Sequence, residues 1–190
     1  LPVYQNLNMI LDIQKVPFGE FKKVKDKKTG KTKTVYKLRH LTKQECEVRI
    51  KEMLKMLCIE ECINYYPSEL SGSMVKRVAL ARAFLHPSRL LLMDEPFNNL
   101  DIELKNEIIK IFIKLWNKSK KTVIFVTHSA DEALSLANNI YFLSGKPLSS
   151  SKKLNIKGKI DNRNITSKEM YQYRKQILDF FIEQVKEEHK

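Results

Sequence analysis

The feature that most constrains the fold is an apolar run that ends in two acidic residues. Leu90 to Met93 are consecutive apolar residues, and Asp94 and Glu95 follow them directly. Such a run predicts a strand buried on both faces of a parallel sheet. Open α/β sheets bind ligands at the carboxyl ends of their strands, where the two carboxylates would emerge. Because unpaired charge near a low-dielectric interior is costly, the pair indicates a bound cation or a proton transfer, or else a strand end that simply reaches solvent.

Helix and strand signals alternate on both sides of this run. Upstream, Ser71 is a good N-cap for a helix. Downstream, Thr122–Val126 predicts a second strand with His128 just after it, and Ser129-x-x-Glu132 is a capping box that would open another helix. This alternation predicts an α/β fold, and a chain of 190 residues can fill a domain core.

Four motifs in this order resemble those of the ATP-binding subunit of ABC transporters, and the resemblance extends over nearly the whole sequence. They are the signature loop LSGSM (Leu70–Met74), the Walker B strand LLLMDE (Leu90–Glu95), the D-loop NNLD (Asn98–Asp101) and the H-loop residue His128. The stretch that follows the Walker B strand looks most like the nitrate, sulfonate and taurine importers. The implied fold is α/β, a partial P-loop NTPase (ABC ATPase) core with a helical subdomain.

The resemblance implies catalytic roles for three residues. Asp94 would hold Mg²⁺ through water, since this ion keeps much of its hydration. Glu95 would orient the attacking water or accept its proton, which needs a carboxylate within hydrogen-bond reach. His128 would contact the γ-phosphate of ATP and help to hold that water.

The signature loop and the D-loop are implied to act across a two-fold dimer. Ser71, Gly72 and Ser73 would bind the ATP held by the second subunit, at a helix N-terminus suited to anions. Asp101 would couple the two sites, or serve as the N-cap of the next helix, or both. Ser73 stands where the family usually has a second glycine, a departure that costs strain if the backbone requires a positive φ there.

The implied function is an ATPase subunit, using ATP and Mg²⁺, that powers import of a small solute such as nitrate, a sulfonate or a taurine-like compound. Its implied partners are transmembrane permease subunits, a second copy of itself and, indirectly, a periplasmic or lipoprotein solute-binding protein. The resemblance implies a place on the cytoplasmic face of the membrane. No apolar run of the sequence approaches the roughly 18 residues of a membrane span. We expect no nucleic-acid partner.

The sequence contains no G-x-x-x-x-G-K-[ST] phosphate loop. The resemblance starts just after the family's Q-loop, so we expect an amino-terminal truncation, and the 190 residues alone should hydrolyse no ATP. Two alternatives stay open. One is an inactive pseudo-subunit that acts only by docking to partners, and the other is a soluble ABC protein that works on nucleic acid.

A strongly basic segment departs from the importer pattern. Phe21–His40 carries nine Lys or Arg against one Asp, in a chain with a net charge of +13. We interpret it as a solvated surface hairpin that turns at Thr29-Gly30, with Lys28–Lys31 as a turn rather than a phosphate loop. Two other interpretations of the segment stay open, namely that it binds single-stranded nucleic acid or that it binds anionic lipid headgroups.

The remaining segments suggest three regions. These are a helical subdomain over 1–88 with the basic insertion at about 17–40, a catalytic core over 89–148 whose strands form one sheet, and a C-terminal extension over 149–190. In the helical subdomain we expect a short helix over Val3–Ile13 and a second one, capped by Thr42 and Glu45, that ends near Cys58. Its apolar face would consist of Cys46, Ile50, Met53, Leu54 and Leu57.

The extension and the cysteines complete the expectations. Ser149–Ser151 is expected to be a flexible break and Leu154–Ile160 an edge strand. Thr166 and Glu169 would cap a final helix that reaches about Val185. Its apolar face would be Met170, Tyr173, Ile177, Leu178 and Phe181.

Cys58 and Cys62 are expected to be buried on a helix, because the three cysteines lack the spacing of a disulfide framework or zinc site.

Overall fold

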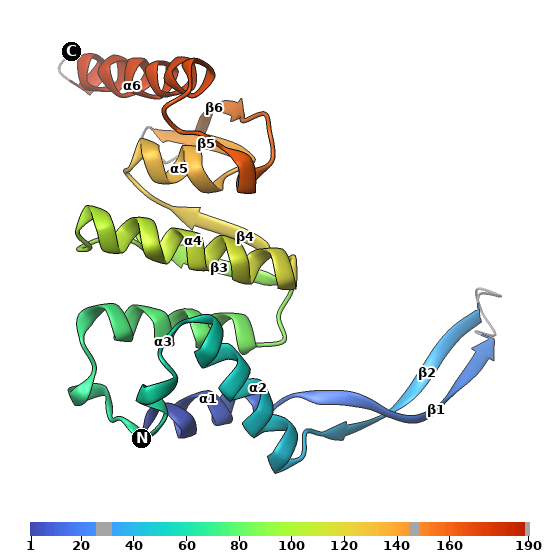
Figure 1. The fold of residues 1–190 in the computed structure, drawn as a ribbon. Helices are drawn as coiled ribbons and strands as arrows, with labels where there is room; N and C mark the ends of the chain where they lie inside the picture. Colours follow the sequence, from blue (N-terminus) through green and yellow to red (C-terminus); the bar gives the residue numbers. More distant parts are fainter. Residues whose placement is uncertain (26–31, 145–148, 189–190) are drawn as a thin grey trace. The chain divides into compact units, whose positions relative to one another are not determined.

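The computed structural model describes residues 1–25, 32–144 and 149–188 and divides the chain into two compact units between Arg89 and Leu90 (Figure 1). The second unit includes the described part of 149–190. The three functional regions that the sequence suggested stay a prediction.

The first unit is a set of helices with one long hairpin. Its elements are α1 (Val3–Asp12), β1 (Lys15–Lys25), β2 (Thr32–His40), α2 (Lys43–Met56), the 3-10 turns η1 (Glu60–Asn64) and η2 (Pro67–Glu69), and α3 (Gly72–Leu85). Helices α1, α2 and α3 contact one another. Val3, Leu7 and Leu11 recur every four residues and lie buried on one face of α1, as the core side of a short helix requires.

The predicted cap and face of α2 are confirmed by its geometry. The Thr42 hydroxyl accepts a hydrogen bond from the Glu45 backbone N–H, and the Glu45 carboxylate accepts one from the Thr42 backbone N–H. This reciprocal box satisfies two backbone donors that the helix itself leaves unpaired. The five residues of the predicted apolar face are all buried, namely Cys46, Ile50, Met53, Leu54 and Leu57.

Strands β1 and β2 pair antiparallel, from Lys15 opposite His40 to Lys25 opposite Thr32. Between Phe18 and Lys22 the register shifts, as at a β-bulge. The predicted turn at Thr29-Gly30 and the Lys28–Lys31 segment lie outside the described residues.

The second unit alternates strands and helices. Its elements are β3 (Leu90–Asp94), α4 (Ile102–Ser119), β4 (Thr122–Val126), α5 (Ala130–Leu136), β5 (Asn139–Ser144), β6 (Ser149–Asn155), the 3-10 turn η3 (Ile160–Asn162) and α6 (Lys168–Glu188). β3 and β4 pair parallel in direct register, and α4 connects them. This β-α-β unit is the arrangement that the apolar run and the following strand predicted.

The expectation that the first strand is buried on both faces was wrong. Leu91 is 9% exposed but Leu92 is 67% exposed, so β3 has one covered face and one open face. β4 repeats this pattern, with Ile124 and Val126 more than half exposed. Among the described strands, β3 and β4 pair only with each other, and the side chains on one face of this two-stranded sheet stay exposed.

The expectation of one sheet through Ser144 was also wrong. β5 does not extend the β3–β4 pair but forms a separate antiparallel pair with β6. Ser149–Ser151, expected to be a break, is the first half of β6, and the strand ends at Asn155 rather than running from Leu154 to Ile160. Pairing with β5 determines this register, because Leu154 lies opposite Ile140 and is buried beside Phe142 in the unit's core.

Helix α6 packs on this second pair of strands through a face that agrees in part with the expected one, because Met170 and Ile177 are buried and Tyr173 packs against the core. Leu178 and Phe181 are 50% and 45% exposed, whereas Phe180 is 5% exposed. The helix begins one residue later than expected, because the Ser167 hydroxyl, not that of Thr166, accepts from the backbone N–H of Met170. The hydrophobic core beneath α6 also contains residues from α5, from β5 and from β6 with the residue that follows it. Its members are Leu134, Phe142, Leu154, Ile156, Met170, Ile177 and Phe180.

The cysteines are free thiols, and one of them is not where it was expected. Cys62 is buried in η1, but Cys58 is exposed. Cys58 lies just past the end of α2 with φ +53, in the left-handed region that terminates helices. Across the described residues, no helix has the length and apolar character needed to cross a bilayer.

Candidate functional site

The carboxyl ends of β3 and β4 place two polar side chains at one edge of a sheet. Asp94 pairs with Val126, and the Glu95 backbone N–H then donates to the Val126 carbonyl at 3.0 Å, which extends the ladder by one bond. Glu95 follows β3 and His128 follows β4 closely. Strands of equal register that end together therefore deliver an acid and an imidazole to the same place.

Glu95 and His128 are in direct contact. Nδ1 of His128 lies 2.8 Å from Oε1 of Glu95, a normal hydrogen-bond distance. An ionised carboxylate only accepts, so in this pairing Nδ1 carries the proton and Nε2 is the other ring nitrogen that a ligand can meet. The His128 side chain is 74% exposed and that of Glu95 is 31% exposed, so both are accessible from solvent.

The turn after β3 holds two residues with positive φ. Glu95 has φ +42 and Asn99 has φ +60, conformations that cost a side-chain-bearing residue roughly 1 kcal/mol or more each. Between them Phe97 is fully buried and meets Phe112 of α4 edge to face, with ring centroids 6.1 Å apart. This buried ring anchors the turn and so holds Glu95 in its strained position.

Asp101 is the N-cap of α4. Its Oδ1 accepts from the Leu104 backbone N–H at 2.8 Å, which is one of the two roles that the sequence suggested. Asp94 is exposed at the end of β3. Throughout the described part of the chain, no three His, Cys, Asp or Glu residues cluster as a cage for a metal. A single exposed carboxylate fits Mg²⁺, which binds through one or two carboxylates and keeps several waters, better than it fits zinc.

A buried ion pair supports the loop that carries His128, and the sequence did not reveal it. The Glu132 carboxylate, 4% exposed, lies 2.7 Å from the Lys105 ammonium and accepts from the Thr127 hydroxyl at 2.6 Å. Ser129 caps α5 as predicted, since its hydroxyl accepts from the Glu132 backbone N–H. Glu132 was expected to complete that capping box, but its side chain instead joins α4 to the end of β4. The signal that could have indicated this is an acid on the inward face of α5.

The signature loop lies in the first unit. Ser71 caps α3, with its hydroxyl accepting from the Met74 backbone N–H at 3.3 Å and lying 3.1 Å from the Ser73 hydroxyl. Ser73 is in the first turn of α3 and is not among the residues with positive φ, so no backbone strain opposes a serine there. A Cβ built at Gly72 would meet nothing within 4 Å. Neither position therefore needs glycine for the fold of this chain.

The structure thus brings the side chains of Glu95 and His128 into contact, and no such contact joins the other predicted residues to this pair among the described hydrogen bonds. Asp94 and Asp101 flank the same turn of the second unit, and Ser71, Gly72 and Ser73 belong to the first unit. The predicted roles of these residues stay predictions.

Comparison with known proteins identifies one family. A family model described as ABC transporter matches residues 7–98. An uncharacterized ABC transporter ATP-binding protein of Methanocaldococcus jannaschii is 37% identical over 150 residues, which are 78% of this chain and 55% of that protein. The aliphatic sulfonates import ATP-binding protein SsuB of Bacillus thuringiensis subsp. konkukian is 37% identical over 138 residues, which are 70% of this chain and 53% of that protein. The chain spans about half the length of these relatives.

A solved structure agrees with this relationship. A dimeric ATP-binding cassette, in a post-hydrolysis state bound to ADP and Pi, is 30% identical with a TM-score of 0.53. The match covers 63% of this chain and 51% of the solved one. The predicted α/β fold of an ABC ATPase core with a helical subdomain is confirmed by this likeness.

Proposed function

We propose that the protein is the ATP-hydrolysing subunit of an importer for a small solute, on the premise that residues 7–98 match the ABC transporter family. The observation that carries the proposal is the 2.8 Å contact between His128 and Glu95 at the paired ends of β3 and β4. This arrangement offers a carboxylate that can accept a proton from water, beside an imidazole that can hold a phosphate oxygen.

The chemistry assigned to each residue follows from its position. Glu95 accepts the proton of the attacking water as the water oxygen bonds to the γ-phosphorus of ATP and the bond from that phosphorus to the ADP oxygen breaks, which releases ADP and phosphate. His128 keeps the Glu95 carboxylate oriented through Nδ1 and, as a doubly protonated imidazolium, donates to a phosphate oxygen through Nε2. Asp94 holds Mg²⁺ through water, and the ion, when bound, neutralises charge that develops on the phosphate oxygens.

The signature loop acts on nucleotide held by another subunit. Ser71 and Ser73 present hydroxyls at the N-terminus of α3, where backbone N–H groups favour an anion. Gly72 leaves open space beside them, which supports close approach of a phosphate. The proposed working unit is a two-fold dimer with two reciprocal sites, which Asp101 would couple.

The solute and the partners are inferred from the relatives. The SsuB relative has a name that refers to aliphatic sulfonates, so an alkanesulfonate or a related small oxyanion is the proposed cargo. The proposed partners are transmembrane permease subunits, which the protein would bind from the cytoplasmic face of the membrane, and, indirectly, a solute-binding protein. Loss of labelled alkanesulfonate uptake in a deletion strain, restored by the intact gene, tests the cargo. Unaltered uptake in the deletion strain would exclude it.

The catalytic assignment is tested with the product of the complete reading frame. Glu95→Gln should lower the rate of phosphate release by about a hundredfold or more and should leave an ATP-bound dimer detectable by size-exclusion chromatography. Glu169→Gln, the same change at an exposed carboxylate in the first turn of α6, is the matched control. Equal turnover in the two variants would remove Glu95 from the catalytic role.

One observation favours a second candidate function. The 190 residues contain no phosphate loop, so this chain alone is expected to bind ATP poorly and to act by docking to partners. Isothermal titration of this chain with MgATP tests the docking role. Undetectable binding together with retained assembly on the permease supports the docking role, and tight binding excludes it.

A further inference from the structure

The hairpin of β1 and β2 concentrates the positive charge of the chain. The two strands, residues 15–25 and 32–40, together have seven Lys or Arg against one acidic residue, nearly half of the net charge of +13. Figure 1 shows the two paired strands running out from α1 and α2 as a ribbon. Lys15, Lys25 and Lys37 are exposed on it. The hairpin is thus a projecting element with a strong excess of cations.

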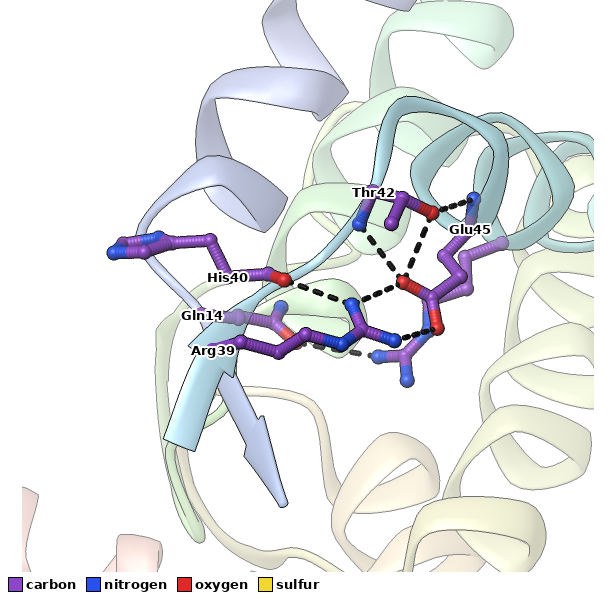
Figure 2. A network of polar contacts seen from close by, with 6 residues as sticks. Gln14, Arg39, His40, Thr42 and Glu45 are labelled. Atoms are coloured by element: carbon purple, nitrogen blue, oxygen red, sulfur yellow. Dashed lines mark hydrogen bonds and ion pairs between the residues drawn. The ribbon is translucent and has the colours of Figure 1, made fainter. Parts of the chain in front are cut away.

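A network of polar contacts joins the base of the hairpin to α2 (Figure 2). The Arg39 guanidinium donates to both carboxylate oxygens of Glu45 at 2.7 Å each, and it also donates to the His40 carbonyl at 2.9 Å. Bidentate pairing of this kind restricts orientation as well as distance. Because Glu45 also closes the capping box with Thr42, the end of β2 is tied to the start of α2.

The start of β1 is tied down as well. The Gln14 side chain is buried, donates to the Leu85 carbonyl at the end of α3 and accepts from Arg49 of α2 at 3.4 Å. His40 Nδ1 lies 2.7 Å from the Asp12 carbonyl at the end of α1. Both strands therefore leave a fixed base, which makes the hairpin a supported arm rather than a loose loop.

We propose that this arm docks the protein on anionic lipid headgroups. The lipid assignment rests on the proposed function, which puts the protein beside a membrane. Each basic residue near an anionic bilayer contributes roughly 1 kcal/mol to attraction, and compact lysine ammonium groups suit phosphate headgroups as point charges. Leu38, 60% exposed beside Lys37, adds an apolar side chain that the headgroup boundary can accept.

The composition of the arm favours diffuse attraction to phosphate over reading of a base sequence. Bidentate reading of bases uses Arg or Lys on guanine and Asn or Gln on adenine, and between Lys15 and His40 there is no Asn or Gln and a single Arg. That residue, Arg39, is committed to Glu45. Sequence-independent binding of single-stranded nucleic acid is the alternative that the experiment must separate from lipid binding.

The test is co-sedimentation of the full chain with vesicles of phosphatidylcholine mixed with phosphatidylglycerol, without nucleotide. Replacing Lys15, Lys25 and Lys37 with Gln should weaken partition by about a hundredfold. A control triple removes the same charge from exposed lysines outside the arm, at Lys110, Lys114 and Lys175. The control triple should bind the vesicles as tightly as the unaltered chain does. Added salt should weaken vesicle binding by the control triple and by the unaltered chain.

Three results would overturn the proposal. They are equal weakening by the two triples, equal binding of the unaltered chain to vesicles of phosphatidylcholine alone, and arm-dependent binding to a DNA oligonucleotide without binding to vesicles. The last would assign the arm to nucleic acid. Circular dichroism of each triple checks folding, and the two measurements on the unaltered chain decide the matter even if a variant does not fold. No step involves ATP, so failure here is distinguishable from failure of the ATPase assignment.

Discussion

The ammonium of Lys105 lies 2.7 Å from the carboxylate of Glu132, and this pair links α4 to α5. The Glu132 side chain is 4% exposed and that of Lys105 is 29% exposed. Glu132 also accepts from Thr127, whose hydroxyl accepts in turn from the Ser129 backbone N–H at 3.0 Å. The two neighbours of His128 are thereby held, which restricts the position from which His128 reaches Glu95.

Removal of Lys105 should destabilise the second unit. Lys105→Met leaves the buried Glu132 carboxylate without its cation. We expect the free energy of unfolding to fall by about 2 kcal/mol, less than for a fully buried pair, because the lysine is partly exposed. Urea denaturation measures it. Lys110→Met, at an exposed lysine of the same helix, is the control and should change stability by less than about 0.5 kcal/mol. Equal midpoints for both variants would show that the pair contributes nothing.

Substitutions in the signature loop should separate function from folding. Gly72→Ala should leave the denaturation midpoint unchanged or raised, because the added Cβ meets open space and alanine favours helix. In the product of the complete reading frame, the same change should slow ATP hydrolysis more than about tenfold if phosphate approaches that space. Ser73→Gly should change turnover less than about tenfold, because Ser73 has no positive φ to relieve. A larger gain from Ser73→Gly would contradict this account.

The anchor of the basic arm should make stability depend on pH. Hydrogen bonds from Arg39, and then from the Thr42 backbone, lower the pKa of Glu45 from 4.5 to about 2. A carboxylate with a lowered pKa stabilises the fold fully above pH 4.5, and that contribution is lost as the pH falls toward about 2. Urea midpoints across this window should fall less steeply for Glu45→Gln than for the unaltered chain. Glu52→Gln, an exposed carboxylate on the same helix, should keep the steeper fall, and parallel curves for all three would refute the anchor's role.

The core under α6 should depend on Phe180 and not on its neighbour. Phe180 is 5% exposed, with its ring centroid 4.4 Å from that of Phe142, whereas Phe181 is 45% exposed. Phe180→Ala should cost about 3 kcal/mol in the free energy of unfolding. Phe181→Ala should cost less than about 1 kcal/mol. The reverse order would mean that α6 packs through the face that the sequence suggested.

Features decided within one turn of chain could be predicted from the sequence. Thr42, Ser71 and Asp101 each cap a helix whose start was expected at that point. A cap depends only on a side-chain oxygen and a backbone N–H two or three residues later, so the sequence contains the whole interaction. The order of β3, α4 and β4, and with it the meeting of Glu95 and His128, followed from the same local signals and from the rule that parallel strands end at one edge.

What only the tertiary structure decided is which groups far apart in the chain become neighbours. Four features depend on such contacts. They are the open face at Leu92, the pairing of β5 with β6, the burial of Phe180 rather than Phe181, and the ion pair of Glu132 with Lys105. The sequence pattern shows that an apolar residue must be buried or that an acidic residue must be paired with a cation. The residue that supplies the cover or the cation is determined by packing of the whole unit, because burial free energy is not directional and many arrangements satisfy the same pattern.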